Sequence, residues 1–275
     1  MAAHYRKMIS IIHNLLKITE DDISMKKKIL IIALWLCIWQ FLAVIVQNNI
    51  LLVGPIETCM TLSKMIMTAV FWQSVLFSFE RIMAGFFAGS MAGVLCAVLA
   101  YKKPLFGEIL APLVMVFKTV PVASFVILLL IWSGNAYLSL LISMIVVFPI
   151  LYLNTLSGLQ STDRKLLEMS EIYHMTAWPR IRYIFLPRLY PFLLGGFKLA
   201  IGMSWKSGIA AEVIGQPFYS IGNGLYRSKI YLATGEVLAW TIVIIGLSWS
   251  FEQIFLLLLK QIDPDRRCRH QGGKI

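Results

Sequence analysis

The chain has 275 residues, of which 59% are hydrophobic and 14% are charged, and its mean hydropathy is +0.76. An ordinary soluble domain carries about 25% charged residues, so this composition excludes a soluble globule and predicts a protein that lipid largely surrounds. Lys and Arg exceed Asp and Glu by 25 − 14 = 11. The basic residues gather in the tails and short connections, as membrane-orientation signals do, and we therefore expect no nucleic-acid partner.

Six apolar segments are close to the ~20 residues that a helix needs to cross the hydrocarbon of a membrane. We therefore expect an all-α membrane protein whose six transmembrane helices form one domain over residues 29–260. Polar tails, residues 1–28 and 261–275, flank this domain. In chain order the predicted crossings cover residues 29–46, 76–100, 109–132, 137–156, 192–213 and 237–259.

Basic residues predict the orientation of these helices. Lys26-Lys27-Lys28 precedes the first crossing, Lys102-Lys103 separates the second from the third, and a basic loop at about residues 160–190 separates the fourth from the fifth. Six crossings put all three, with both tails, on one side, and the positive-inside rule makes that side the cytoplasm. We therefore expect a multi-pass protein of the cell membrane (plasma or inner) with both termini cytoplasmic.

The second crossing carries Gly85, Gly89 and Gly93 at four-residue steps. This spacing puts three small residues on one helix face, which is typical of close helix contact in lipid. The pattern fits ordinary packing within the bundle, and it also fits a dimer or pore face.

Several residues that are unusual inside a membrane predict a path for a solute. Charged groups within crossings are costly and often functional, and helix-breaking prolines often border a transport path. Structural pairing, or snorkelling of the lysines toward the membrane surface, is the alternative. The candidate path residues are Lys118, Pro121, Ser204, Lys206, Gly208 and Glu212.

Motifs of enzymes are missing from the sequence. There is no Gly-x-x-x-x-Gly-Lys phosphate loop, so we expect the chain not to bind ATP. The four histidines have no metal-ligand spacing, and no Gly-x-Ser-x-Gly motif occurs. We expect no catalytic residue, metal or cofactor in this chain. An intramembrane protease or a lipid-modifying enzyme remains the alternative, because charged residues lie in the crossings.

The polar stretch from Asp163 to Pro191 predicts two short helices. Asp163 is positioned to cap the first and Thr176 to cap the second. One face of the first helix carries Leu166, Met169, Ser170 and Tyr173. Such a face is suited to a soluble partner, and beside basic residues it is also suited to anionic lipid.

The same stretch resembles a known loop signature. Glu168 is followed by Met169-Ser170, by His174 six residues after Glu168, and by Ile184-x-Leu186-Pro187. This pattern is similar to the loop of permeases in binding-protein-dependent ABC importers, in which a glycine occupies the position of His174. Histidine is enriched among non-glycine residues at positive φ, so we expect a left-handed turn to end the first helix.

Further segments resemble the nitrate, taurine and aliphatic-sulfonate branch of that family. They are Lys118-Thr119-Val120-Pro121, Leu129 to Trp132, Phe148 to Thr155, and Ala211 to Gly215. The resemblance implies a permease for a small anion such as a sulfonate, taurine, nitrate or bicarbonate. It also implies that a second permease copy, two cytoplasmic ATPase subunits that use ATP, and an external solute-binding protein are partners. The coupling residues that it implies are Leu166, Glu168, Met169, Ser170, Tyr173, His174, Ile184, Leu186 and Pro187.

Overall fold

A computed structural model describes residues 27, 30–48 and 50–261, and the regular elements within these residues are all helices. The all-α class is therefore confirmed for this part of the chain. Apart from Lys27 and Gln261, the predicted tails lie outside the described residues. The limits of the transmembrane domain stay a prediction.

Three long helices form the centre of the fold. They are α3 (Ala69–Lys102), α6 (Leu138–Gln160) and α9 (Leu186–Gly215), and α6 packs along both of the others. The main core cluster lies among them, with Phe86 and Trp205 as its largest fully buried side chains. Aromatic and aliphatic burial of this kind supplies packing contacts, which stabilise helix association in lipid.

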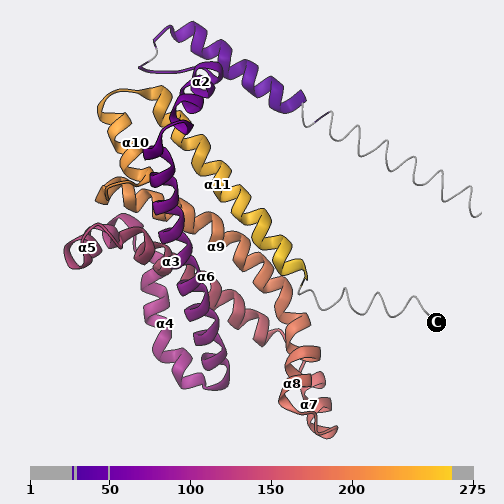
Figure 1. Ribbon diagram of the computed structural model, residues 1–275. Helices are drawn as coiled ribbons and strands as arrows, with labels where there is room; N and C mark the ends of the chain where they lie inside the picture. Colours follow the sequence, from indigo (N-terminus) through magenta and orange to yellow (C-terminus); the bar gives the residue numbers. More distant parts are fainter. Residues whose placement is uncertain (1–26, 28–29, 49, 262–275) are drawn as a thin grey trace, which may run out of the picture.

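The bundle has two distinct ends (Figure 1). At one end lie α7 (Arg164–Ile172), α8 (Ala177–Arg180) and the turn between α3 and α4 (Pro104–Thr119), which we name the loop end. At the other lie α2 (Pro55–Ile66) and α10 (Ile221–Ile230), which we name the α10 end. The last helix, α11 (Thr234–Gln261), starts at the α10 end and runs along the bundle.

The three spaced glycines of α3 face α6. A Cβ at Gly89 would lie 2.7 Å from the carbonyl oxygen of Met144, and one at Gly93 would lie 2.7 Å from that of Phe148. At Gly85 it would overlap the carbonyl of Leu140. The stripe therefore forms a contact inside one chain, where the two backbones nearly touch.

The predicted third crossing is interrupted at the predicted proline. It is divided into α4 (Pro104–Thr119) and α5 (Val122–Ser133), which are bent by 104° relative to each other. Pro121 explains the break, because it has no N–H and disfavours a helical residue before it. Val120 accordingly has an extended backbone, with φ −70° and ψ 132°.

Four helices in the described residues are long and apolar enough to cross a membrane, and there are five if the bent pair is one span. The first predicted crossing corresponds to the shorter apolar helix Leu30–Val46. Its side chains are mostly exposed, and Trp39 Nε1 donates to the carbonyl of Val53 at 3.0 Å. The count of six crossings stays a prediction.

The predicted second helix of the polar loop is not a separate element. Helix α8 continues through a π turn, η1 (Ile181–Phe185), into α9, so one helical segment runs from Ala177 to Gly215. Thr176 precedes this segment, but its side chain makes no capping hydrogen bond within the described chain. The predicted fifth crossing, residues 192–213, therefore lies within a longer helix, whose continuity the polar residues of α8 conceal in the sequence.

Candidate functional site

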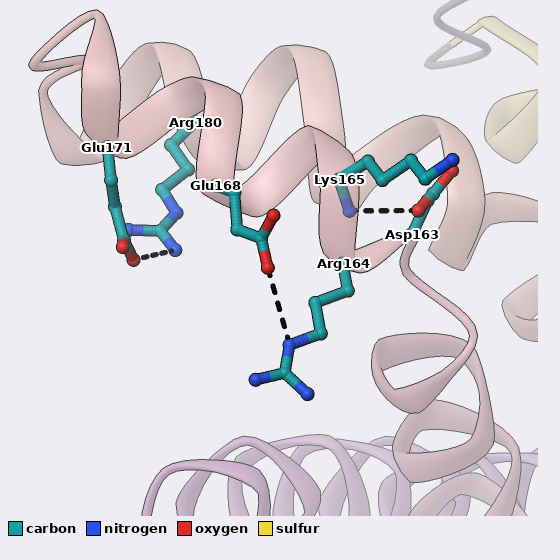
Figure 2. A network of polar contacts seen from close by, with 6 residues as sticks. All are labelled: Asp163, Arg164, Lys165, Glu168, Glu171 and Arg180. Carbon is teal, nitrogen blue, oxygen red and sulfur yellow. Dashed lines mark hydrogen bonds and ion pairs between the residues drawn. The ribbon is translucent and has the colours of Figure 1, made fainter.

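Helix α7 begins where the sequence predicts. The Asp163 carboxylate accepts a hydrogen bond from the backbone N–H of Lys165 at 2.9 Å, as Figure 2 shows. This bond satisfies one of the unpaired N–H groups of the first turn and places negative charge at the positive end of the helix dipole. The predicted cap at Asp163 is confirmed.

The predicted apolar face of α7 is divided between two directions. Ser170 is buried and Leu166 is half-buried. Met169 and Tyr173 are exposed by 42% and 75%. Ile172, which was not among the predicted residues, is also 75% exposed. These three apolar or aromatic side chains therefore project from α7 at the loop end, and Trp178, Ile181 and Tyr183 of the same loop are also exposed.

Two ion pairs join charged residues of the loop (Figure 2). Glu168 Oε1 lies 3.5 Å from Nε of Arg164 on the same exposed helix, a kind of pair that contributes little to stability. Glu171 Oε1 lies 3.3 Å from Arg180 Nη2 and links α7 to α8. The sequence pattern gave no indication of this second pair, because nine residues and a turn separate its members.

A left-handed turn ends α7. His174 has φ +49°, as expected from the sequence. Its N–H bonds the carbonyl of Glu171, and the N–H of Met175 bonds that of Ser170, at 3.0 and 2.9 Å. These two bonds form a Schellman motif, which satisfies the last carbonyls of a helix. Together with the Glu171–Arg180 pair, the motif fixes the direction in which the chain returns to the bundle.

The last predicted coupling residues form the base of the loop. Ile184 is buried within the π turn, and Leu186 and Pro187 are half-buried at the start of α9. Beside them, the rings of Phe185 and Tyr101 meet edge to face, with centroids 5.9 Å apart. The last turn of α3 therefore contacts the base of the loop.

A cavity of about 720 Å³ lies between α3, α4 and α6. Its walls are largely apolar, and Lys118, Glu108, Tyr152 and Gln160 bring polar groups to it. The predicted path residue Lys118 therefore borders an open volume. Pro121 is exposed at the bend that follows.

The predicted path residues of α9 lie on two faces. Ser204 and Gly208 are buried, and a Cβ at Gly208 would lie 2.8 Å from both Ile82 Cγ1 and Ser143 Oγ. Lys206 is exposed on the other face. That face also carries Gly202, whose added Cβ would meet no described atom within 4 Å. The structure therefore does not bring Lys206 together with Ser204 and Gly208.

Glu212 is fully buried where α3, α9 and α10 meet. Its Oε2 accepts the hydroxyl proton of Ser78 at 2.7 Å and the backbone N–H of Gly222 at 3.2 Å. The partner that the sequence could not identify is thus a serine 134 residues away.

Arg81, a charged residue on α3, was not among the predicted site residues. The guanidinium of Arg81 lies 4.2 Å from the ring centroid of Phe77 and 5.0 Å from that of Tyr137. Cation–π contacts of this kind help to hold a charge in a partly desolvated position. The available signal was an arginine inside the second predicted crossing.

Known proteins resemble the chain over most of its length. Residues 89–267, more than half of the chain, match the family described as "Binding-protein-dependent transport system inner membrane component". A putative aliphatic sulfonates transport permease protein of Bacillus subtilis is 26% identical, over 86% of this chain and 85% of the relative. A taurine transport system permease protein of Escherichia coli is 24% identical, over 85% and 87%. A bicarbonate transport system permease protein of Synechocystis is 27% identical, over 60% and 61%.

Proposed function

The chain belongs to the family of binding-protein-dependent transport system inner membrane components, and we propose that two copies of it form the path of a small anion across the membrane. It is a transport permease subunit, and the alternative of a membrane enzyme is set aside because the family and the relatives are transport components. Family membership implies ATPase and solute-binding-protein partners.

The exposed face of α9 supports the proposed path. Lys206 lies nine residues before the end of α9 at Gly215, which is about 14 Å along the helix axis. A lysine at that depth is unfavourable in contact with lipid and is expected to face a polar interior. A second copy that covers this face would enclose the lysine in such an interior. The small Gly202 beside it leaves room for a solute.

The proposed substrate class follows from charge. Lys206 on α9 and Lys118 at the cavity are cations on surfaces that the chain leaves open. The relatives are permeases for aliphatic sulfonates, taurine and bicarbonate, all of which carry an anionic group. A small anion therefore fits both the charges and the relatives.

The exposed α7 is the observation that carries the proposed coupling to an ATPase. Met169, Ile172 and Tyr173 project from the loop end, and Glu168 adds a carboxylate that is 63% exposed. A groove on an ATPase would bury the apolar groups and pair the carboxylate. Because the Schellman turn and the Glu171–Arg180 pair close the loop, α7 would pass a push from the ATPase directly to α9. We therefore propose that the loop end lies in the cytoplasm.

Co-purification of the ATPase with permease variants in one detergent tests the coupling. Glu168→Lys replaces an attraction worth about 1.5–3 kcal/mol, the usual range for a charge-assisted hydrogen bond, with repulsion. We expect the variant to insert normally, to lose most of its ATPase and to transport little. The control is Glu57→Lys, a charge reversal in α2 at the α10 end, which we expect to retain the ATPase.

A loop that only lies on anionic lipid predicts the opposite result, because added positive charge favours such a surface. Equal recovery of the ATPase with Glu168→Lys and with wild type, together with unchanged transport, would contradict the proposed docking.

A further inference from the structure

The first turn of α10 is held by side chains from other helices. The N–H of Ile221 donates to Ser78 Oγ at 2.9 Å, and the N–H of Gly222 donates to Glu212 Oε2 at 3.2 Å. The N–H of Asn223 donates to its own cap, Ser220 Oγ, at 3.0 Å. In most helices the acceptor for these first N–H groups is the side chain of the N-cap residue. Here two of the three acceptors lie on α3 and α9.

Glu212 and Ser78 act as one acceptor unit. The Ser78 hydroxyl donates to Glu212 Oε2 at 2.7 Å and, through its lone pair, accepts from Ile221. A buried carboxylate needs such donors, because an unpaired one is strongly destabilised by the loss of water. The N-terminus of α10 adds the positive end of its dipole. The position of α10 therefore compensates the burial of Glu212 Oε2, while Oε1 is buried without a hydrogen-bond partner in the described residues.

Two glycines let α10 sit directly on its supports. A Cβ at Gly222 would overlap the Cβ and the backbone of Glu212. A Cβ at Gly224 would lie 2.7 Å from Cε2 of Trp240 on α11. Near the other end of α10, the Ser228 hydroxyl donates to Glu236 Oε2 at 2.8 Å. Helix α10 is therefore held near both of its ends, and it cannot move closer to α9 or α11.

The backbone on either side of α10 is unusual. Gln216, Tyr219 and Leu232 have φ of +49°, +55° and +54°, although none is glycine. Left-handed residues of this kind persist only where the surroundings hold them in place. The contacts around α10 therefore hold it in one defined position.

We propose that Glu212 is a positioning residue that fastens α10 to α9, so that α10 follows the same helical segment that carries α7 at its other end. That segment, Ala177–Gly215, has 39 residues and is about 58 Å long. The inference rests on the proposed function, in which α7 receives the ATPase. A movement at the loop end would then reach the opposite surface of the permease without an intervening loop.

Hydrogen exchange of the purified permease tests the fastening by itself. Glu212→Gln keeps an acceptor oxygen for both donors, and we expect the amides of residues 221–223 to exchange as slowly as in wild type. Glu212→Ala and Ser78→Ala remove acceptors, and we expect exchange to be faster by about tenfold or more, because local opening then becomes easier. Ser90→Ala is the matched control, since Ser90 is buried on the same helix 12 residues from Ser78.

Unchanged exchange in both alanine variants would overturn the inference. Fast exchange in Glu212→Gln would also overturn it, because the role assigned to Glu212 depends on accepting hydrogen bonds. If Glu212→Ala fails to fold, Ser78→Ala and Glu212→Gln still decide the question.

Cysteine labelling of the complex with the ATPase tests the relay. Lys229 is exposed on α10, and Lys229→Cys in a background without the four native cysteines reports the surroundings of α10. We expect the labelling rate to change on adding a non-hydrolysable ATP analogue in wild type and in Glu212→Gln. In Glu212→Ala we expect no change, while basal ATP hydrolysis by the partner subunit continues.

The two possible failures are distinguishable. Absence of the ATPase from the purified wild-type complex would contradict the proposed function. Hydrogen exchange of the permease alone would still test whether Glu212 holds α10 against α9. A complex that retains its ATPase but shows no nucleotide-dependent labelling in wild type, or an unaltered response in Glu212→Ala, would overturn the relay alone.

Discussion

Glu171 at the end of α7 and Arg180 in α8 form an ion pair of 3.3 Å across the turn that joins the two helices. The Glu171 side chain is 68% exposed and that of Arg180 is 31% exposed, so the pair is expected to contribute little to global stability. Its position is more informative than its strength. It connects the helix proposed to meet the ATPase with the segment that continues into α9.

The first prediction therefore separates coupling from stability. Arg180→Glu places two carboxylates together, and we expect a normally folded permease with weaker coupling between ATP hydrolysis and transport. The double variant Glu171→Arg/Arg180→Glu restores the attraction and should recover most of the coupling. Transport per ATP hydrolysed in proteoliposomes is the measurement. A double variant no better than Arg180→Glu would show that the pair has no such role.

The second prediction concerns the contact between α3 and α6. Gly89→Leu forces a side chain against the backbone of Met144, and such overpacking typically costs about 1–3 kcal/mol. We expect a lower yield of folded protein and a lower melting temperature. Gly246→Leu is the control, because an added Cβ there meets no described atom within 4 Å. Equal stability of the two variants would contradict the close contact between the glycines of α3 and the backbone of α6.

The third prediction concerns topology. In a background without native cysteines, Asn135→Cys and Asn223→Cys should react with an impermeant reagent added outside intact cells. Lys103→Cys lies in the turn at the loop end and should react only after permeabilisation, because basic turns stay in the cytoplasm. Labelling of Lys103→Cys from outside would contradict the arrangement with six crossings.

The fourth prediction concerns Lys206. If its ammonium attracts the solute, Lys206→Gln should raise the apparent KM for import by about tenfold to a hundredfold, since a hydrogen bond to a charged group contributes about 1.5–3 kcal/mol. Lys206→Arg keeps the charge and should retain most of the affinity. Import into right-side-out vesicles that contain the assembled system measures both. An unchanged KM in Lys206→Gln would remove Lys206 from the path.

Local chemistry made part of this structure predictable. Asp163 caps α7 through a bond to a residue two positions away, and His174 adopts the left-handed turn that its residue type tolerates. Long apolar runs likewise predicted an all-α protein. In each case the deciding interaction lies within a few residues of the signal.

Other features depend on contacts that sequence spacing does not reveal. The partners of Glu212 are Ser78 on α3 and an N–H on α10, so its burial needed the tertiary fold. Pro121 was recognised as an interruption, but whether a proline kinks a helix or divides it depends on the surrounding packing. Pro149 lies within α6, whereas Pro121 separates α4 from α5 by 104°.

The π turn of Ile181–Phe185 lies between α8 and α9 inside one continuous helical segment. A π turn holds one residue more than regular α-helical geometry, and each residue advances a helix by roughly 100° around its axis. Deleting one residue from this turn is therefore expected to restore regular α-helical bonding and to leave the direction of α7 nearly unchanged. Removing a residue from the regular helix on either side would instead turn α7 by roughly 100° about the axis of α9. The π turn thus gives the segment one position at which the chain length can differ by a residue without moving the surface that is proposed to meet the ATPase.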